Sequence, residues 1–136
     1  MEHAIHPEPT TFIRKHVFSV DHKVIGRQYL ILGMTWALLG GLMAYAIRHQ
    51  LAWPMQKVTG ASLFINGAAG PGIIMPEAYN ALLTMHGTIM VFFVAMPILI
   101  GALGNFLVPL MIGARDMAFP RLNTTSFWLL CAASLV

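Results

Sequence analysis

The stretch AYNALLTMHGTIMVFFVAMPILIGALGNFLVPLMIGA, residues 78–114, decides the fold of this chain. It carries no formal charge apart from a possible one on His86. An α-helix needs about 20 apolar residues to cross the hydrocarbon layer of a membrane, and this run is longer. Pro97 and Pro109 lie inside it, where membrane helices tolerate proline because neighbouring groups satisfy the carbonyls that proline frees. The pattern predicts one long, kinked membrane helix.

A second membrane helix is predicted from residues 28–47, QYLILGMTWALLGGLMAYAI, which carry no charge. At about 1.5 Å per residue this run spans about 30 Å, the thickness of the hydrocarbon layer. Arg27 and Arg48 bracket the run, and Asp21 is the predicted N-cap. Residues 122–136, LNTTSFWLLCAASLV, begin a third helix that is too short to cross. We therefore expect the chain to be a piece of a longer protein.

The composition agrees with a membrane protein and excludes several other classes. Hydrophobic residues make up 57% of the chain and charged residues 10%, whereas soluble domains carry about 25% charge. Lipid is therefore the expected solvent. The eight Lys and Arg are scattered, which argues against a nucleic-acid-binding face. The single cysteine, Cys131, offers no disulfide framework and is interpreted as a small buried residue.

The distribution of basic residues predicts the orientation. Lys and Arg concentrate in the loops on the inner side of a membrane. Here the N-terminal segment and residues 115–121 hold six of the eight: Arg14, Lys15, Lys23, Arg27, Arg115 and Arg121. Both regions are therefore predicted to lie inside, and the loop 48–77 outside. Residues 1–18 lack the apolar core of a cleavable signal peptide.

These patterns give an expected domain organisation. A cytoplasmic N-terminal segment covers residues 1–26, and a membrane domain covers residues 27–136. The expected elements of that domain are helix one at about 27–48, an outer loop at 49–78, helix two at about 79–113 and the start of helix three at 122–136. The loop is rich in Gly and Pro, as turns are.

His86 is the first candidate functional residue. An ionisable side chain at membrane depth suggests function, and neutral imidazole is the commonest metal ligand. The alternative is a hydrogen-bonded structural histidine. At 100° per residue, six residues share its face: Tyr79, Met90, Phe93, Pro97, Gly101 and Gly104. This face could hold a flat macrocycle close to the backbone, or it could pack against another helix through its small residues.

Arg48 and Asp116 are the other charged candidates. Arg48 ends helix one at about the depth of His86, where it could bind a propionate, polarise a carbonyl substituent or anchor the helix at the interface. Asp116 lies toward the inner side with Asn105 and Asn123. A carboxylate with amides can hold a water chain that conducts protons. A surface ion pair or helix cap at Asp116 is the alternative.

Two stretches resemble a known family. Residues 79–130, YNALLTMHGTIMVFFVAMPILIGALGNFLVPLMIGARDMAFPRLNTTSFWLL, and residues 19–33, SVDHKVIGRQYLILG, closely resemble subunit I of haem–copper oxidases. The resemblance covers nearly everything from residue 19 onward. It implies an all-α membrane bundle of about twelve helices, in which each helix satisfies its own backbone polar groups.

The resemblance also implies roles for individual residues. His86 matches one axial ligand of the low-spin haem iron, and Arg48 matches the arginine that hydrogen-bonds the formyl group of haem A. Tyr79, Gly87 and Met90 match positions that pack near this haem.

On the inner side, the resemblance implies a route for protons. Asp116 matches the entrance carboxylate of the principal proton channel, and Asn105 and Asn123 match amides of the same entrance.

The implied function is that of a cytochrome c oxidase, a respiratory electron-transport enzyme that reduces oxygen to water and pumps protons. The high-spin haem and the copper CuB are expected only in the remainder of subunit I. CuA is expected on a partner subunit. Subunits II and III, cytochrome c and the lipid bilayer are the implied partners. A bacterial inner membrane with a cytoplasmic N-terminus is the expected location, and this stretch alone is expected to be inactive.

Some positions depart from particular branches of the family. Gln50 stands where some members have the glutamate of a cation site, so bound calcium or sodium is not expected. Ala78 and Ala81 stand where the quinol-oxidising branch has His and Gln, which favours cytochrome c as the donor.

A quinol-oxidising haem–copper oxidase is the alternative within enzymes. A truncated, catalytically silent membrane polypeptide that only packs against partners is the alternative outside them.

Overall fold

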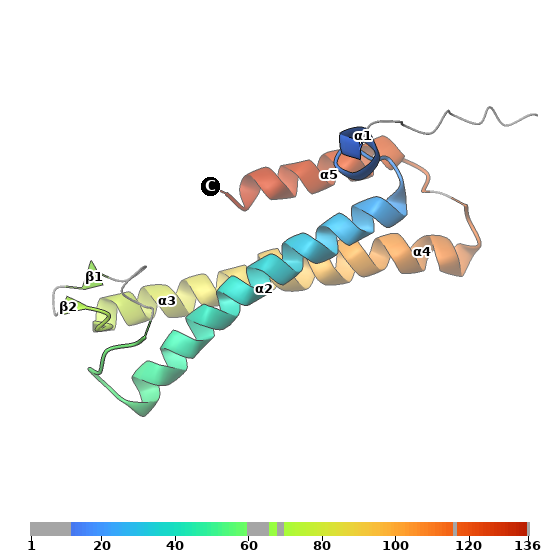
Figure 1. Cartoon of the computed structure of the whole chain (residues 1–136). Helices are drawn as coiled ribbons and strands as arrows, with labels where there is room; N and C mark the ends of the chain where they lie inside the picture. The colour runs from blue at the N-terminus through green and yellow to red at the C-terminus, as the bar shows by residue number, and fades with distance from the viewer. Residues whose placement is uncertain (1–11, 60–65, 68–69, 116, 136) are drawn as a thin grey trace, which may run out of the picture. The chain divides into compact units, whose positions relative to one another are not determined.

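The computed structural model describes residues 12–59, 66–67, 70–115 and 117–135 (Figure 1). These residues are mostly helical, with one short ribbon and the connections between elements, which confirms the predicted all-α class. The helices are α1 (Phe12–His16), α2 (His22–Ala52), α3 (Pro76–Thr88), α4 (Gly104–Ile112) and α5 (Pro120–Ala133). The ribbon pairs β1 (Asn66–Gly67) with β2 (Gly70–Pro71) in antiparallel register, Asn66 opposite Pro71.

The first long helix, α2, extends beyond the uncharged run 28–47 at both ends. Asp21 caps it as predicted: the carboxylate Oδ1 accepts the Lys23 N–H at 2.9 Å, and the carbonyl accepts the Ile25 N–H at 3.0 Å. With 31 residues, α2 is about 46 Å long at 1.5 Å per residue. It is therefore long enough to cross the hydrocarbon layer and both polar interfaces of a bilayer.

The second long helix is continuous from Pro76 to Ile112 but is not α-helical throughout. Two π-helical stretches, η2 (Ile89–Ala95) and η3 (Pro97–Leu103), separate α3 from α4. The Met96 N–H donates to the Val91 carbonyl five residues earlier, as in a π-turn. Pro97 has no N–H, and π-turns are one way for a membrane helix to satisfy the carbonyls that proline frees.

The π-turns change how side chains project from this helix. The face predicted around His86 assumed 100° per residue, which holds for α-helix but not for hydrogen bonds that span five residues. Residues beyond Thr88 therefore do not follow the predicted stripe in register. Sequence periodicity could not show this change, because apolar residues occupy nearly every position of the run.

The chain forms two compact units, each built around part of both long helices. One unit contains the described residues of 32–97. In it, the loop after α2 folds onto helix ends through an apolar cluster of Ala46, Val58 and Ile74, against which Tyr79 packs. The Val58 N–H donates to the Gly72 carbonyl at 2.9 Å. Gly72 has φ 85°, a left-handed conformation that glycine adopts without strain.

The other unit contains the described residues of 1–31 and 98–136. Its helices approach closely at two glycines. A Cβ added at Gly101 would overlap the ring of Tyr29, and one added at Gly26 would lie 3.0 Å from the ring of Phe106. Tyr29 also makes an edge-to-face contact with Phe127 of α5, with ring centroids 5.1 Å apart. These contacts pack α2, α4 and α5 together within this unit.

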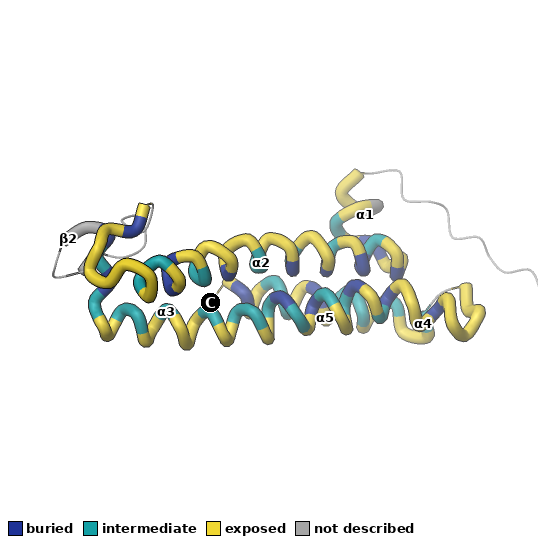
Figure 2. Tube along the Cα trace, turned by 90° about the horizontal axis from the view of Figure 1, so that it is seen from below, coloured by how far each residue is buried: buried dark blue, intermediate teal, exposed yellow. Residues whose placement is uncertain are grey.

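The surface of both long helices is apolar and exposed. Figure 2 shows the exposed positions along α2, α3 and α4. They include Leu38 at 68%, Ile100 at 69% and Leu110 at 79% exposure. Such surfaces are unfavourable in water and require lipid or other helices around them. With two helices long and apolar enough to cross a membrane, the chain is an integral membrane protein.

Candidate functional site

His86 lies on α3, half-buried, and faces α2. Its Nδ1 is 3.0 Å from the carbonyl oxygen of Gly40. A carbonyl can only accept a hydrogen bond, so Nδ1 must carry the proton that it donates. In the neutral imidazole, Nε2 is then unprotonated and keeps its lone pair. Within the described part of the chain, no residue hydrogen-bonds this nitrogen.

Gly40 has no side chain, which leaves room for Met90 at this helix contact. A Cβ added there would lie 2.7 Å from Sδ of Met90, which is closer than van der Waals contact. At the adjacent Gly41 an added Cβ would meet nothing within 4 Å. Gly40 is therefore the glycine at the helix contact, whereas Gly41 points away from it. Sequence reasoning missed Gly40 because both glycines lie in one apolar run.

The remaining predicted neighbours of His86 lie in different surroundings. Met90 packs beside Gly40 in the same contact. Tyr79 packs in the loop cluster. Gly87 is exposed, and an added Cβ there would meet nothing within 4 Å. The structure therefore brings Met90 and His86 to one contact with α2 and does not bring Gly87 or Tyr79 into it.

The predicted stripe on this helix is used largely for helix packing. Phe93 lies beside Trp36 of α2, with ring centroids 5.4 Å apart. In the other unit, the Tyr29 ring fills the space beside Gly101. The interpretation of this face as a packing surface holds at these positions. Gly104 has open space where a Cβ would lie.

Arg48 lies on the last turns of α2 and is exposed. Among the described residues none forms an ion pair or hydrogen bond with its guanidinium, whose donors are thus available to a group outside this chain. The next two residues of α2 carry buried polar atoms. His49 Nδ1 and Gln50 Oε1 have no hydrogen-bond partner among the described residues.

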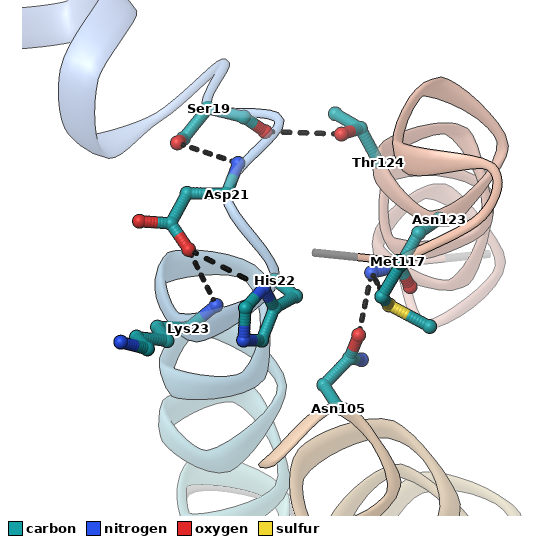
Figure 3. Close-up of polar contacts among 8 residues, drawn as sticks. All are labelled: Ser19, Asp21, His22, Lys23, Asn105, Met117, Asn123 and Thr124. Carbon is teal, nitrogen blue, oxygen red and sulfur yellow. Dashed lines mark hydrogen bonds and ion pairs between the residues drawn. The ribbon is translucent and has the colours of Figure 1, made fainter. Parts of the chain in front are cut away.

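Asn105 and Asn123 are brought together by the fold of the other unit. Asn105 is 4% exposed. Its Nδ2 donates to the Gly101 carbonyl. Its Oδ1 accepts a hydrogen bond from Nδ2 of Asn123 (Figure 3). Asn123 Nδ2 also lies 3.1 Å from Sδ of Met117. Buried amides need such partners, and these amides join the long helix to α5. Asp116, the third predicted member of this group, lies outside the described residues.

A further polar group lies at the start of α2, near the amide pair (Figure 3). His22 is 7% exposed, and its Nδ1 is 3.8 Å from Oδ1 of Asp21. The Thr124 hydroxyl donates to the Ser19 carbonyl at 3.0 Å. Sequence reasoning treated His22 only as the residue after the cap. A titratable side chain at the first position of a membrane helix was the signal that could have identified it.

The chemistry available to these residues is limited. Across the described ranges, no three His, Cys, Asp or Glu side chains gather to hold a metal ion. His86 can therefore supply one nitrogen ligand, and any further ligand must come from elsewhere. The amide pair, with Asp21 and His22 near it, can order water and exchange protons at one end of a membrane helix.

Known proteins resemble this chain along most of its length. Residues 24–136 match the family model described as cytochrome C and quinol oxidase polypeptide I. The chain is 51% identical over 124 residues to cytochrome c oxidase subunit 1 of Thermostichus vulcanus, which covers 91% of this chain and 20% of that relative. It is 46% identical over 112 residues to cytochrome c oxidase subunit 1 of Synechocystis sp., covering 82% and 17% respectively.

A eukaryotic relative gives a similar result. Cytochrome c oxidase subunit 1 of Candida albicans is 41% identical over 120 residues, which covers 88% of this chain and 20% of that protein. The chain therefore spans about one fifth of the length of the curated relatives that it matches.

Proposed function

Because the chain belongs to the cytochrome c and quinol oxidase polypeptide I family, we propose that it is the N-terminal part of the core subunit of a respiratory terminal oxidase. The complete enzyme transfers electrons from cytochrome c to oxygen, reduces oxygen to water and pumps protons. In this proposal the chain supplies one ligand of the low-spin haem and the entrance of a proton channel. It acts only within the complete complex.

The observation that carries the proposal is the hydrogen bond between His86 and Gly40. Histidines that bind metals usually donate their second ring N–H to a carboxylate or a backbone carbonyl, which fixes the tautomer and the ring orientation. His86 meets this condition, since Nδ1 donates to the Gly40 carbonyl at 3.0 Å. The residues therefore fit a haem iron bound at Nε2. The haem supplies one-electron chemistry when it is bound.

Arg48 contributes to the same site in this proposal. Its guanidinium is exposed and makes no ion pair with the described residues, so it can donate hydrogen bonds to the formyl oxygen of haem A. A cationic donor at that position stabilises the electron-rich, reduced form of the haem and raises its midpoint potential. Met90 packs beside Gly40, whose carbonyl accepts the His86 hydrogen bond. Tyr79 and Gly87 are proposed to lie near the haem on the basis of family resemblance alone.

The proton entrance is proposed in the unit that contains residues 1–31 and 98–136. Asp116 is its proposed carboxylate, and Asn105 and Asn123 are its proposed amides. Buried polar side chains in a membrane helix are costly and therefore often functional. Asn105 is such a residue, at 4% exposure, and its side chain accepts a hydrogen bond from Asn123. His22, buried and beside the Asp21 carboxylate, adds a titratable group to this end of the channel.

The rest of the enzyme is proposed to lie outside this chain. The second axial ligand of the low-spin haem, the high-spin haem and CuB belong to the remainder of subunit I. CuA belongs to a partner subunit, and subunits II and III are the proposed partners. We place residues 1–26 in the cytoplasm and residues 27–136 in the membrane domain of a bacterial inner-membrane protein. The N-terminal segment and the loop 115–121 together hold six of the eight Lys and Arg, which places both on the inner side.

Cytochrome c is the proposed donor rather than quinol. The relatives above are named cytochrome c oxidase, and Ala78 and Ala81 replace the His and Gln of the quinol branch. The test is oxygen uptake by the purified complex that contains this chain, with reduced cytochrome c or with a water-soluble quinol. We expect uptake with cytochrome c and little with quinol. The reverse result would assign the chain to the quinol branch, and uptake with neither donor would contradict an oxidase.

A further inference from the structure

The segment before α2 carries apolar side chains that the chain itself does not cover. We call residues 12–20 the pre-helix segment; it contains α1 and the turn into α2. Phe12 is 72% exposed, Ile13 56%, Phe18 58% and Val20 50%. Four large apolar side chains within nine residues are unfavourable in water and call for an apolar surrounding.

Hydrogen bonds hold the pre-helix segment beside the first turns of α2. The Gln28 side-chain Nε2 donates to the carbonyls of His16 and Val17, at 2.6 and 3.0 Å. On the other side, the Ser19 carbonyl accepts the Thr124 hydroxyl at 3.0 Å. The Phe18 ring stacks on Trp128 of α5, with centroids 5.1 Å apart. The segment is thus held at the end of a membrane helix and does not extend away into water.

The direction of α1 places it along a membrane surface. In both views of the structure, α1 lies at a steep angle to the first part of α2 and does not continue its axis (Figures 1 and 2). Because α2 is long and apolar enough to cross the membrane, a short helix that lies across its end runs roughly parallel to the membrane plane. At that depth, apolar side chains reach the boundary between headgroups and acyl chains.

The charges near the segment favour a lipid surface over water. Residues 12–27 contain four basic residues, Arg14, Lys15, Lys23 and Arg27, and one acidic residue, Asp21. Basic side chains next to a membrane helix are attracted to anionic lipid headgroups. Exposed aromatic and aliphatic side chains together with a basic excess are the combination found in interfacial anchors.

We propose that the pre-helix segment is an interfacial anchor that binds anionic phospholipid at the membrane surface where α2 begins. Phe12, Ile13 and Phe18 enter the headgroup–acyl boundary, and the basic residues bind the lipid phosphates. The bonds from Gln28 and Thr124 transmit this position to the first turns of α2 and α5. The inference rests on the membrane span of α2 and not on oxidase activity.

The experiment uses the complete membrane protein that contains this chain, reconstituted into lipid nanodiscs. A fluorescent amino acid replaces Ile13, and lipids with a spin label near the headgroup serve as shallow quenchers. Discs contain either phosphatidylcholine alone or phosphatidylcholine with phosphatidylglycerol. We expect roughly threefold stronger lipid quenching in the anionic discs, because basic residues draw the segment to the surface. The double variant Arg14→Glu/Lys15→Glu should reduce the quenching to the level in neutral discs.

A charge reversal in another part of the chain shows whether a change in quenching depends on the charges of the pre-helix segment. Lys57→Glu alters a basic residue of the loop after α2 and should leave the quenching at position 13 unchanged. Two results would overturn the proposal. A probe that aqueous iodide quenches and lipid does not would place the segment in water. A probe shielded from both iodide and lipid would show that a protein partner covers it.

Discussion

The His86 contact and the Asn105–Asn123 pair are both polar sites between membrane helices, but only one of them is complete. The two amides satisfy each other and a backbone carbonyl. His86 uses one nitrogen on the Gly40 carbonyl and has no described partner for the other. A half-buried imidazole whose second nitrogen has no described partner can accept a ligand, whereas a satisfied pair supports packing and a local water network. In the proposed function, the His86 contact is a ligand site and the amide pair is part of the proton entrance.

The largest effect is expected for Asp116→Asn at the proposed proton entrance. We expect turnover and proton uptake to fall by about a hundredfold, since a carboxylate that relays protons cannot be replaced by an amide. Haem content should stay at the wild-type level. Proton uptake in single-turnover experiments and pyridine haemochrome spectra measure the two quantities. Unchanged proton uptake would remove Asp116 from the channel, and lost haem would indicate a structural role instead.

The amide pair itself can be tested by a double-mutant cycle. Asn105→Ala removes the hydrogen bonds to the Asn123 amide and the Gly101 carbonyl, which should cost about 1–3 kcal/mol of unfolding free energy. Asn123→Ala should cost a similar amount. Because the two residues share one hydrogen bond, the double variant should lose less than the sum. Denaturation in detergent measures each value, and strict additivity would show that the pair is not coupled.

Arg48→Ala tests the proposed haem site that contains His86. A hydrogen bond from a charged donor is worth about 1.5 kcal/mol, which corresponds to a lower midpoint potential of on the order of 60 mV for one electron. The visible band of the low-spin haem should shift at the same time. Redox titration followed by absorbance measures both. Lys57→Ala, in the loop after α2, is the control and should change neither.

The smallest expected effect distinguishes the two adjacent glycines of α2. In an exposed helix interior, Gly→Ala stabilises by up to about 1 kcal/mol. Gly41→Ala should show this gain, since an added Cβ meets nothing within 4 Å. At Gly40 the added Cβ would lie 2.7 Å from Sδ of Met90, so the gain should be lost to overpacking. Thermal unfolding compares the two, and equal stability would show that Met90 moves aside freely.

The sequence was sufficient to predict the long helices and the Asp21 cap. An uncharged run that is long enough to cross a membrane has few possible structures other than a membrane helix. Asp before a helical run is a local capping signal that needs no tertiary information. These features depend on neighbours in sequence, which is why they could be predicted.

The sequence was not sufficient for features that depend on contacts between helices. The π-turns around Pro97 changed the projection of the predicted face, and Tyr29 filled the space beside Gly101. The Gly40 carbonyl, which orients His86, lies 46 residues away in sequence. Family resemblance placed Asn105 and Asn123 in one region, and the structure joins them by a hydrogen bond. Their role in proton transfer stays a prediction.

The measurement that tests the account most directly is the low-spin haem signal of a His86→Leu variant of the purified complex. His22→Leu, which removes a buried histidine of the other unit, is the matched control. We predict that His86→Leu loses the low-spin haem spectrum and oxygen reduction, whereas His22→Leu keeps the spectrum. A His86→Leu complex that retains a normal low-spin haem signal would contradict the assignment of Nε2 as an iron ligand.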